Sequence, residues 1–322
     1  MTAGKAASSR QIKNRLEAEI VQSKSTEMTS TQITNSLPRD PRYYQITVLA
    51  GLLIYGIAWL GFDIGAAQVM TLLGSALLTQ YLCMKIARLP KFDPRSALIS
   101  GLSLCLLLRT NNPSLMIAAA VVAIASKFVL TWRDKHFFNP TNLGIVLMIA
   151  LSGDAWVSPA QWGSKLYFAF LVAGLGGMVI HRAMRSDVSY AFIAGYAAIL
   201  FGRAFWLGDP VAIPLKQLQS GALLLFTFFM ISDPKTTPDS RAGRILFAWL
   251  VAAGAAYVQF GLYRTNGLLW SLALCSLLTP LIDYFLPGTK YRWHSQTPAL
   301  PRKGDSHEKN LLGAFPAADA IR

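Results

Sequence analysis

The chain has 322 residues, of which 53% are hydrophobic and only 14% are charged, whereas about a quarter of the residues are charged in an average soluble domain. The mean hydropathy is +0.39, and the charged residues gather at the two ends and in short segments between long apolar runs. A large soluble core would need a charged surface around it, which this distribution does not provide. The composition therefore argues against a soluble enzyme and predicts an all-α polytopic membrane protein.

The net charge is +14, from 30 Lys and Arg against 16 Asp and Glu. In a soluble protein this excess would suggest a nucleic-acid partner. No basic stretch carries interleaved aromatic residues, so we expect no nucleic acid and take the lipid bilayer as the surrounding partner. Lys and Arg accumulate in the cytoplasmic loops of membrane proteins, and this alone explains the basic total.

Apolar windows between charged and turn residues predict about ten transmembrane helices. Their approximate limits are 44–62, 67–86, 97–109, 113–131, 141–152, 165–181, 188–203, 215–231, 244–263 and 267–286. The third and fifth are too short to cross roughly 30 Å of hydrocarbon at about 1.5 Å per residue. We expect these two to be extended by polar residues or to be broken helices.

Basic residues orient the predicted spans. With the N-terminus inside, 24 of the 30 Lys and Arg fall on the cytoplasmic side, while the outer connections carry residues such as Asp154 and Trp156. Residues 1–43 are polar and lack the apolar core of a signal peptide, and residues 289–322 are also polar. Both segments are interpreted as cytoplasmic tails flanking a transmembrane domain over 44–288.

Ten spans divide into two repeats of five, at about 44–152 and 165–286, and an odd repeat unit places the second copy upside down in the membrane. Weak internal similarity favours this arrangement, because small or polar pairs recur at corresponding helix starts. The pairs are Ser100-Gly101 with Ser220-Gly221, and Thr141-Asn142 with Thr265-Asn266.

Polar residues at the start of the short fifth span form the first candidate site. Asn139 precedes Pro140, which fits the first turn of a helix, so Asn139 is expected at the N-cap and Asn142 in the first turn. One interpretation is a capped helix start. The other is an amide-lined pocket at a positive helix end.

A second polar stretch follows the eighth span and lies on the same predicted side of the membrane. It contains Asp233 and Thr236, and Asp233 either ends the helix or faces a pocket. If the two stretches converge, two amides and a carboxylate suit a planar heterocycle with an imide edge. Lys127, near the end of the fourth span, either extends to the interface or lines this pocket with Asp283 or Asp233 as its counter-charge.

Other polar residues carry weaker signals. His136 and His181 lie at helix ends and are expected to be solvated rather than to bind haem. The cysteines lie within apolar runs and form no metal-binding spacing, so no metal is expected. No catalytic motif is present.

Three stretches resemble one known family. "KFVLTWRDKHFFNPTNLGIVLMIAL" resembles the segment of the NqrB/RnfD family in which a Lys precedes an F-N-P helix start. "SGALLLFTFFMISDPKTTPDSRAGRILFA" is similar to its S-G to T-D-P stretch, and "GLLWSLALCSLLTPLIDYF" to its last span. The resemblance runs from about residue 44 to 288 and implies a fold like that of urea transporters.

The resemblance also implies a function, which is at most that of a non-catalytic membrane subunit of an oxidoreductase complex. Family members are membrane subunits of electron-transport complexes in the bacterial inner membrane, and they pass electrons through flavins to partner redox subunits or flavoproteins. A non-covalent riboflavin or FMN near the cytoplasmic face is implied. Carried over to this chain, Asn139, Asn142 and Asp233 are its polar contacts, and Thr236 and Lys127 lie beside them.

One departure concerns covalent flavin. The family attaches FMN to a Thr in an outer-loop S-G-A-T motif, whereas the loop here reads "SGDAWVSPAQWGS" and has no Thr. We therefore do not expect covalent FMN. The alternative function is a solute channel or transporter on the same fold, as an accessory protein of a biosynthetic pathway.

Overall fold

The computed structural model describes residues 40–133, 135–158, 166–182 and 185–291, which belong to one structural unit. Most of residues 1–43 and 289–322, the predicted tails, lie outside the described residues, as does the outer loop over 159–165. Within residues 166–182, the side chains of 166–171 and of 182 are also outside the described part.

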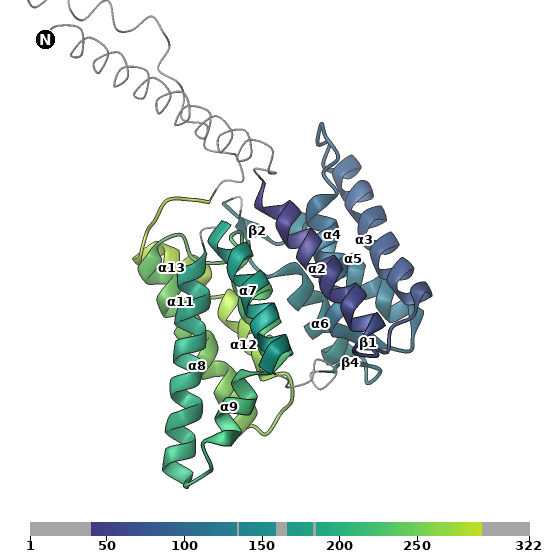
Figure 1. Cartoon of the computed structure of the whole chain (residues 1–322). Helices are drawn as coiled ribbons and strands as arrows, with labels where there is room; N and C mark the ends of the chain where they lie inside the picture. The colour runs from purple at the N-terminus through teal and green to yellow at the C-terminus, as the bar shows by residue number, and fades with distance from the viewer. Residues whose placement is uncertain (1–39, 134, 159–165, 183–184, 292–322) are drawn as a thin grey trace, which may run out of the picture. The chain divides into compact units, whose positions relative to one another are not determined.

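The described part of the chain is mostly helical, and its helices form two successive halves (Figure 1). The first half contains α2 (Pro41–Ala58), α3 (Ala66–Ile86), α4 (Arg95–Leu107), α5 (Pro113–Val129) and α6 (Pro140–Leu151). The second half contains α7 (Leu166–Arg182), α8 (Ser186–Leu207), α9 (Ala212–Leu218), α10 (Gly221–Leu225), the π-helix η2 (Phe226–Met230), α11 (Arg241–Ala256), the π-helix η3 (Tyr257–Gly261), α12 (Gly267–Ser276) and α13 (Thr279–Phe285).

Two short antiparallel ribbons mark the two faces of this unit. β2 (Thr131–Trp132) pairs with β3 (Lys135–His136) near the start of α2 and the end of α13, which we name the terminal face. β1 (Leu108–Thr110) pairs with β4 (Ala155–Val157) at the other ends of the helices, which we name the opposite face.

Proline and a capping side chain set the start of several helices. Asp40, Asn112 and Asn139 each precede a proline and each accept a backbone N–H of the first turn, at 3.0 Å in every case. Proline fits the first helical position because its missing N–H would have no partner there. The Asp-Pro and Asn-Pro pairs therefore fix where α2, α5 and α6 begin.

Among the described residues, three helices are long and apolar enough to cross a membrane alone: α3, α8 and the continuous stretch Arg241–Gly261. A fourth crossing results if α12 and α13, which are bent by 52° to each other, count as one broken span. The predicted third and fifth spans correspond to α4 and α6, with 13 and 12 residues. The chain after α4 continues as the extended strand β1, so α4 is not lengthened at that end.

The predicted eighth span is broken. Over 215–231 the chain forms the end of α9, then α10 and then η2. Ser220 separates α9 from α10 in an extended conformation, with φ −62° and ψ 123°. A π-helix inside a membrane helix commonly marks a functional position, because it opens the regular hydrogen-bond ladder.

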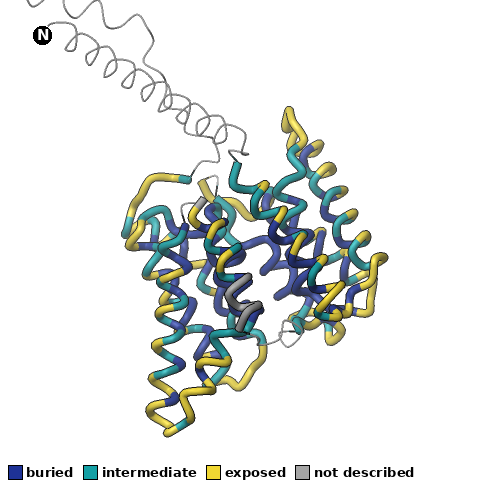
Figure 2. Tube along the Cα trace, viewed as in Figure 1, coloured by how far each residue is buried: buried dark blue, intermediate teal, exposed yellow. Residues whose placement is uncertain are grey.

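Many large apolar side chains of this unit are exposed, unlike those of a soluble protein, and several polar side chains are buried. Ile86 and Phe205 are 82% and 88% exposed, whereas Asn142 and Thr227 are fully buried. The longest buried stretches lie in α4 with β1, in the first turns of α6, and over α10 and η2 (Figure 2). Apolar side chains outside and polar side chains inside are typical of helices surrounded by lipid.

The two halves use the same close helix contact. A Cβ placed on Gly144 of α6 would lie 2.7 Å from the Ala119 carbonyl oxygen of α5, and one on Gly267 of α12 would lie 2.6 Å from that of Ala255 in α11. In each half, glycine lets the last long helix approach the backbone of the preceding one. The halves meet where α6 packs on α12 and α2 on α7.

We expect Gly144→Ala to destabilise the protein by about 1–3 kcal/mol, because the added methyl group must push α6 away from α5. Gly267→Ala should carry a similar penalty. The measurement is thermal unfolding of the detergent-solubilised chain. Gly174→Ala in α7, where a Cβ meets nothing within 4 Å, is the matched control. Equal stability of the Gly144 and Gly174 variants would contradict the close contact.

Candidate functional site

The start of α6 is buried between the two halves and held by two asparagines. The Asn139 amide nitrogen donates to the Met230 carbonyl of η2 at 3.2 Å, and the Asn142 amide nitrogen donates to the Leu269 carbonyl of α12 at 3.0 Å. The Asn142 side-chain oxygen is buried and has no hydrogen-bond partner among the described residues. Both predicted site residues therefore lie at the junction of the halves, and one keeps an unused acceptor.

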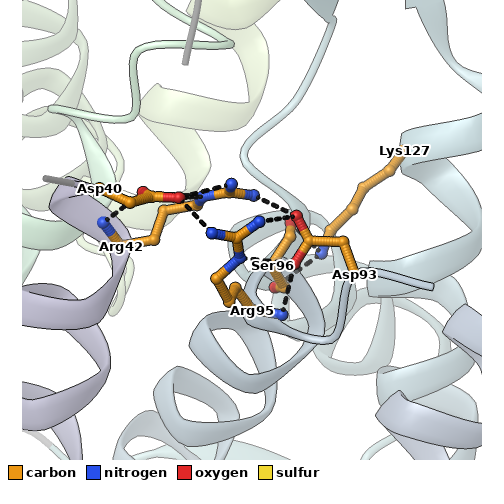
Figure 3. Close-up of polar contacts among 6 residues, drawn as sticks. All are labelled: Asp40, Arg42, Asp93, Arg95, Ser96 and Lys127. Atoms are coloured by element: carbon orange, nitrogen blue, oxygen red, sulfur yellow. Dashed lines mark hydrogen bonds and ion pairs between the residues drawn. The ribbon is translucent and has the colours of Figure 1, made fainter. Parts of the chain in front are cut away.

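Lys127 lies at the end of α5 and reaches the start of α4 (Figure 3). Its ammonium group donates to the Ser96 carbonyl at 2.9 Å and to the Ser96 hydroxyl at 3.0 Å. One turn further along α4, the Ser100 carbonyl accepts a hydrogen bond from the Thr141 hydroxyl of α6 at 3.4 Å. The first two turns of α4 thus connect Lys127 to the helix that carries the asparagines.

Asp233 lies in the turn that follows η2, three residues after the carbonyl held by Asn139. Its carboxylate accepts the Lys235 backbone N–H at 3.0 Å. Burial raises the pKa of Asp233, and the nearby charges of Lys127, Lys235 and Arg185 only partly oppose this shift. The carboxylate is therefore a weaker acid than an exposed aspartate.

Thr236 supports this turn rather than facing the asparagines. Its hydroxyl donates to the Asp233 carbonyl at 3.2 Å, and its own carbonyl accepts from Thr279 of α13 at 3.3 Å. The structure thus brings Lys127, Asn139, Asn142 and Asp233 together on the inner side of the terminal face. Ser96, which sequence analysis missed, binds Lys127. We name Ser96 and these four residues the polar cluster.

His136 differs from the expectation of a solvated histidine. Its Nδ1 atom is buried without a hydrogen-bond partner among the described residues. Burial, reinforced by the charges of Lys127 and Lys235, lowers the pKa of His136 to about 4. The ring is therefore neutral at physiological pH. His181 is exposed, in agreement with the expectation.

Four alternating charges join α2 to α4 beside the polar cluster (Figure 3). Asp40 pairs with Arg42 at 2.7 Å and with Arg95 at 2.5 Å, and Asp93 pairs with the same two arginines at 2.8 Å each. Burial alone would raise the pKa of Asp93, but hydrogen bonds from Arg95 and the charge of Arg42 lower it to about 2. We name this arrangement the charge ring.

Lys135 connects the two halves at the terminal face. Its ammonium group lies 3.1 Å from Asp239, before α11, and 2.6 Å from Asp283 in α13. The neighbouring His136 N–H donates to the Lys235 carbonyl at 3.1 Å. Of the two counter-charges considered for Lys127, Asp283 is therefore wrong, because Lys135 occupies it, and Asp233 is the carboxylate that interacts with Lys127.

A cavity of about 690 Å³ lies toward the opposite face. Aromatic side chains of Trp156, Tyr196 and Phe226 line it, together with Gln259 and Arg264. The Tyr196 hydroxyl donates to the Gln259 side-chain oxygen at 2.7 Å. The described lining thus combines aromatic surface with amides and one cation, and it contains no carboxylate.

The cavity and the polar cluster share a wall. Met230 and Leu269 line the cavity, and the carbonyl groups of these same residues accept the amide hydrogen bonds of Asn139 and Asn142. The asparagines therefore fix the part of η2 and α12 that separates the cavity from the terminal face. Sequence spacing alone gave no signal for this arrangement.

Apolar helices exposed outside and a buried polar cluster inside define a helical membrane protein with several crossings. Residues 151–292 match the NQR2, RnfD, RnfE family. The second half of the chain is thus similar to this family. The matched segment covers the second half, so the Asn139 motif and the helices before it lie outside that match.

Relatives of the chain are named as subunits of an ion-translocating oxidoreductase complex. The protein from Erwinia tasmaniensis is 30% identical over 161 residues, which cover 49% of this chain and 41% of the relative. Those from Citrobacter koseri and Alcanivorax borkumensis are 31% and 34% identical over 42% and 38% of this chain, and over 36% of each relative. The chain thus matches about two fifths or less of the length of these relatives.

We expect Lys135→Met to lower the free energy of unfolding by about 3–5 kcal/mol, because it leaves two carboxylates without their cation. Asp239 and Asp283 are 9% and 19% exposed, so water compensates little. Thermal unfolding in detergent measures the loss. Lys85→Met, at an exposed position on the same face, is the control, and equal melting temperatures of the two variants would contradict a connection between the halves through Lys135.

The raised pKa of Asp233 predicts a pH-dependent stability. Because the folded state holds this proton more tightly, ionised Asp233 costs stability above its folded pKa, and the cost disappears as the pH falls through that value. Asp233→Asn keeps an acceptor for the Lys235 N–H. It should raise the melting temperature at about pH 7.5, with a difference that shrinks toward about pH 4. Asp154→Asn, at an exposed site, should show neither effect, and a pH-independent difference would refute the assignment.

Proposed function

We propose that this chain is a membrane subunit of an electron-transport complex that binds a flavin, riboflavin or FMN, non-covalently at the polar cluster. The names of the relatives support a role beside other membrane redox subunits or flavoproteins. The binding of a flavin is inferred from the polar cluster itself. When bound, a flavin accepts and donates electrons, while the protein provides its orientation and electrostatic environment.

One observation carries the flavin proposal. The Asn142 side-chain oxygen is a buried acceptor without a partner among the described residues, and such a group costs about 1–3 kcal/mol. Lys127, which is connected to α6 through the first two turns of α4, uses two N–H donors on Ser96 and keeps a third. One acceptor and one donor of this kind complement the N–H and C=O groups of the flavin imide edge.

The other residues of the site hold these two groups in place. Asn139 caps α6 and anchors it to η2, which fixes the backbone on which Asn142 lies. Asp233 and Thr236 form the turn that closes this region toward the terminal face. We assign Asn142 and Lys127 to direct contact with the ring, and Asn139, Asp233 and Thr236 to the shape of the site.

Attachment without a covalent bond is supported by the loop after α6. Its first hydroxyl, that of Ser152, donates to the Met148 carbonyl at 2.7 Å and caps the end of α6. No threonine occurs between residues 152 and 164. A flavin held only by contacts is released intact when the protein unfolds.

We further propose that the two halves are inverted five-helix repeats in a bacterial inner membrane, with both termini cytoplasmic. The packing of α3 on α5 and α5 on α6 has its counterpart in α8 on α11 and α11 on α12. Gly144 and Gly267 make the same close approach in these pairs. The distribution of Lys and Arg supports placing the terminal face in the cytoplasm.

A second candidate function, a solute pathway, is favoured by the cavity. Its volume of about 690 Å³ lies within the range of roughly 300–1,000 Å³ that small-molecule sites occupy. It lies beside α10 and α12, which begin inside the unit, and discontinuous helices of this kind form the binding sites of transporters. In that case the polar cluster would be the closed end of the pathway.

A visible spectrum of the purified chain distinguishes the two functions. We expect the flavin absorbance at about 450 nm and release of unmodified flavin on denaturation. Asn142→Ala should weaken flavin binding at least about tenfold, equivalent to about 1.4 kcal/mol. Asn112→Ala removes an asparagine that caps α5 on the opposite face and should leave binding unchanged.

Three results would count against flavin binding at this site. Colourless protein that takes up neither riboflavin nor FMN would favour the solute pathway. Equal flavin affinity of the Asn142 and Asn112 variants would place the flavin elsewhere. Flavin that stays bound to the denatured chain would exclude non-covalent attachment.

A further inference from the structure

Lys127 is a buried ammonium group with no carboxylate at ion-pair distance. It is 8% exposed, and none of the ion pairs formed by the described residues includes it. A buried charge without a counter-charge is costly, and hydrogen bonds to neutral groups offset only part of that cost. The ammonium group of Lys127 therefore has hydrogen-bond acceptors but no ion-pair partner among the described residues.

The carboxylates around Lys127 are already engaged. Asp93 is held by two arginines of the charge ring, and Asp283 by Lys135. Asp233 is the remaining one close to Lys127, and it accepts a hydrogen bond from the Lys235 backbone. Its raised pKa makes it a weak counter-charge.

The ammonium group is fixed in position. Ser96 provides both acceptors, its carbonyl and its hydroxyl, from the first turn of α4. The preceding residue, Arg95, is bound to Asp93 and Asp40 of the charge ring, so the start of α4 is itself anchored to α2 (Figure 3). A charge held by such a rigid support stabilises an opposite charge more than a mobile one does.

We propose that Lys127 is the counter-charge for an anionic group of the bound ligand and that Ser96 is its positioning residue. This inference rests on the proposed function, in which the ligand is a flavin. Two-electron reduction of the ring with uptake of one proton at N5 leaves a negative charge on its N1–C2=O edge. The electrons come from a one-electron redox partner. Lys127 then binds the reduced form more tightly than the oxidised form and raises the midpoint potential.

The test is a spectroelectrochemical titration of the full chain in detergent, loaded with riboflavin and reduced with dithionite. Lys127→Met should lower the preference for reduced riboflavin at least tenfold, which lowers the two-electron midpoint potential by about 30 mV. Lys127→Arg, which keeps the charge, should restore most of this shift. Ser96→Ala removes one of the two acceptors and should give a smaller shift in the same direction.

Controls separate an effect on the ring charge from an effect on surface charge or on a phosphate group. Lys85→Met removes an exposed positive charge at the same face and should leave the potential unchanged. Riboflavin has no phosphate, so an effect with riboflavin excludes a phosphate contact. An equal loss of affinity for oxidised and reduced FMN, with an unchanged potential, would assign Lys127 to phosphate and overturn the inference.

Different experimental results would overturn the inference about Lys127 and the proposed function. An unchanged riboflavin potential in Lys127→Met, with the ligand still bound, overturns the role of Lys127 and leaves flavin binding intact. If the methionine variant does not fold, the potential of Ser96→Ala decides, and an unchanged value overturns the inference. A wild-type chain that binds neither flavin removes both proposals.

Discussion

Buried polar groups that must find partners away from water are the constraint on which the rest of this structure depends. α6 begins inside the protein, where its free N–H groups and two asparagine side chains cannot be hydrated. The Asn139 side chain caps α6 and so provides a partner for one of its N–H groups. The amide nitrogens of both asparagines donate to carbonyl groups of the second half. The junction of the two halves is therefore built from the same contacts that allow a helix to start inside the unit.

The two faces of the unit carry different kinds of side chains. At the terminal face, the charge ring and Lys135 tie helix starts together, and opposite charges neutralise one another within a few ångströms. Toward the opposite face, the halves leave a cavity with aromatic walls, and the described lining has a single cation. The polar cluster lies between these regions, next to the charge ring on one side and separated from the cavity by Met230 and Leu269 on the other.

Much of the fold was predictable because its signals are local. Apolar runs located the helices, and the Asn-Pro pair located the start of α6 with Asn139 as its cap. The sequence also showed that α4 and α6 are short, because their apolar windows are short. The ten crossings and the inverted repeat stay predictions, since in the described part of the chain three helices, or four spans with the bent pair α12 and α13, meet the length and hydropathy of a full span.

The supporting contacts of the candidate site were not predictable, because they join residues far apart in the chain. Lys127 and Ser96 are 31 residues apart, and Lys135 and Asp283 are 148 apart. Each is an ordinary polar residue in its own segment, with nothing to indicate its partner. Sequence analysis therefore considered Asp283 and Asp233 as alternative counter-charges for Lys127, whereas in the structure Asp283 pairs with Lys135.

The shared wall formed by Met230 and Leu269 has a thermodynamic consequence. Their side of the cavity and the carbonyl groups that hold Asn139 and Asn142 belong to the same two residues. An occupant of the cavity that shifts these residues changes the free energy of binding at the polar cluster. Linkage requires that a ligand at the polar cluster changes affinity in the cavity by the same factor. Met230 and Leu269 are therefore the residues through which a change in one compartment would reach the other.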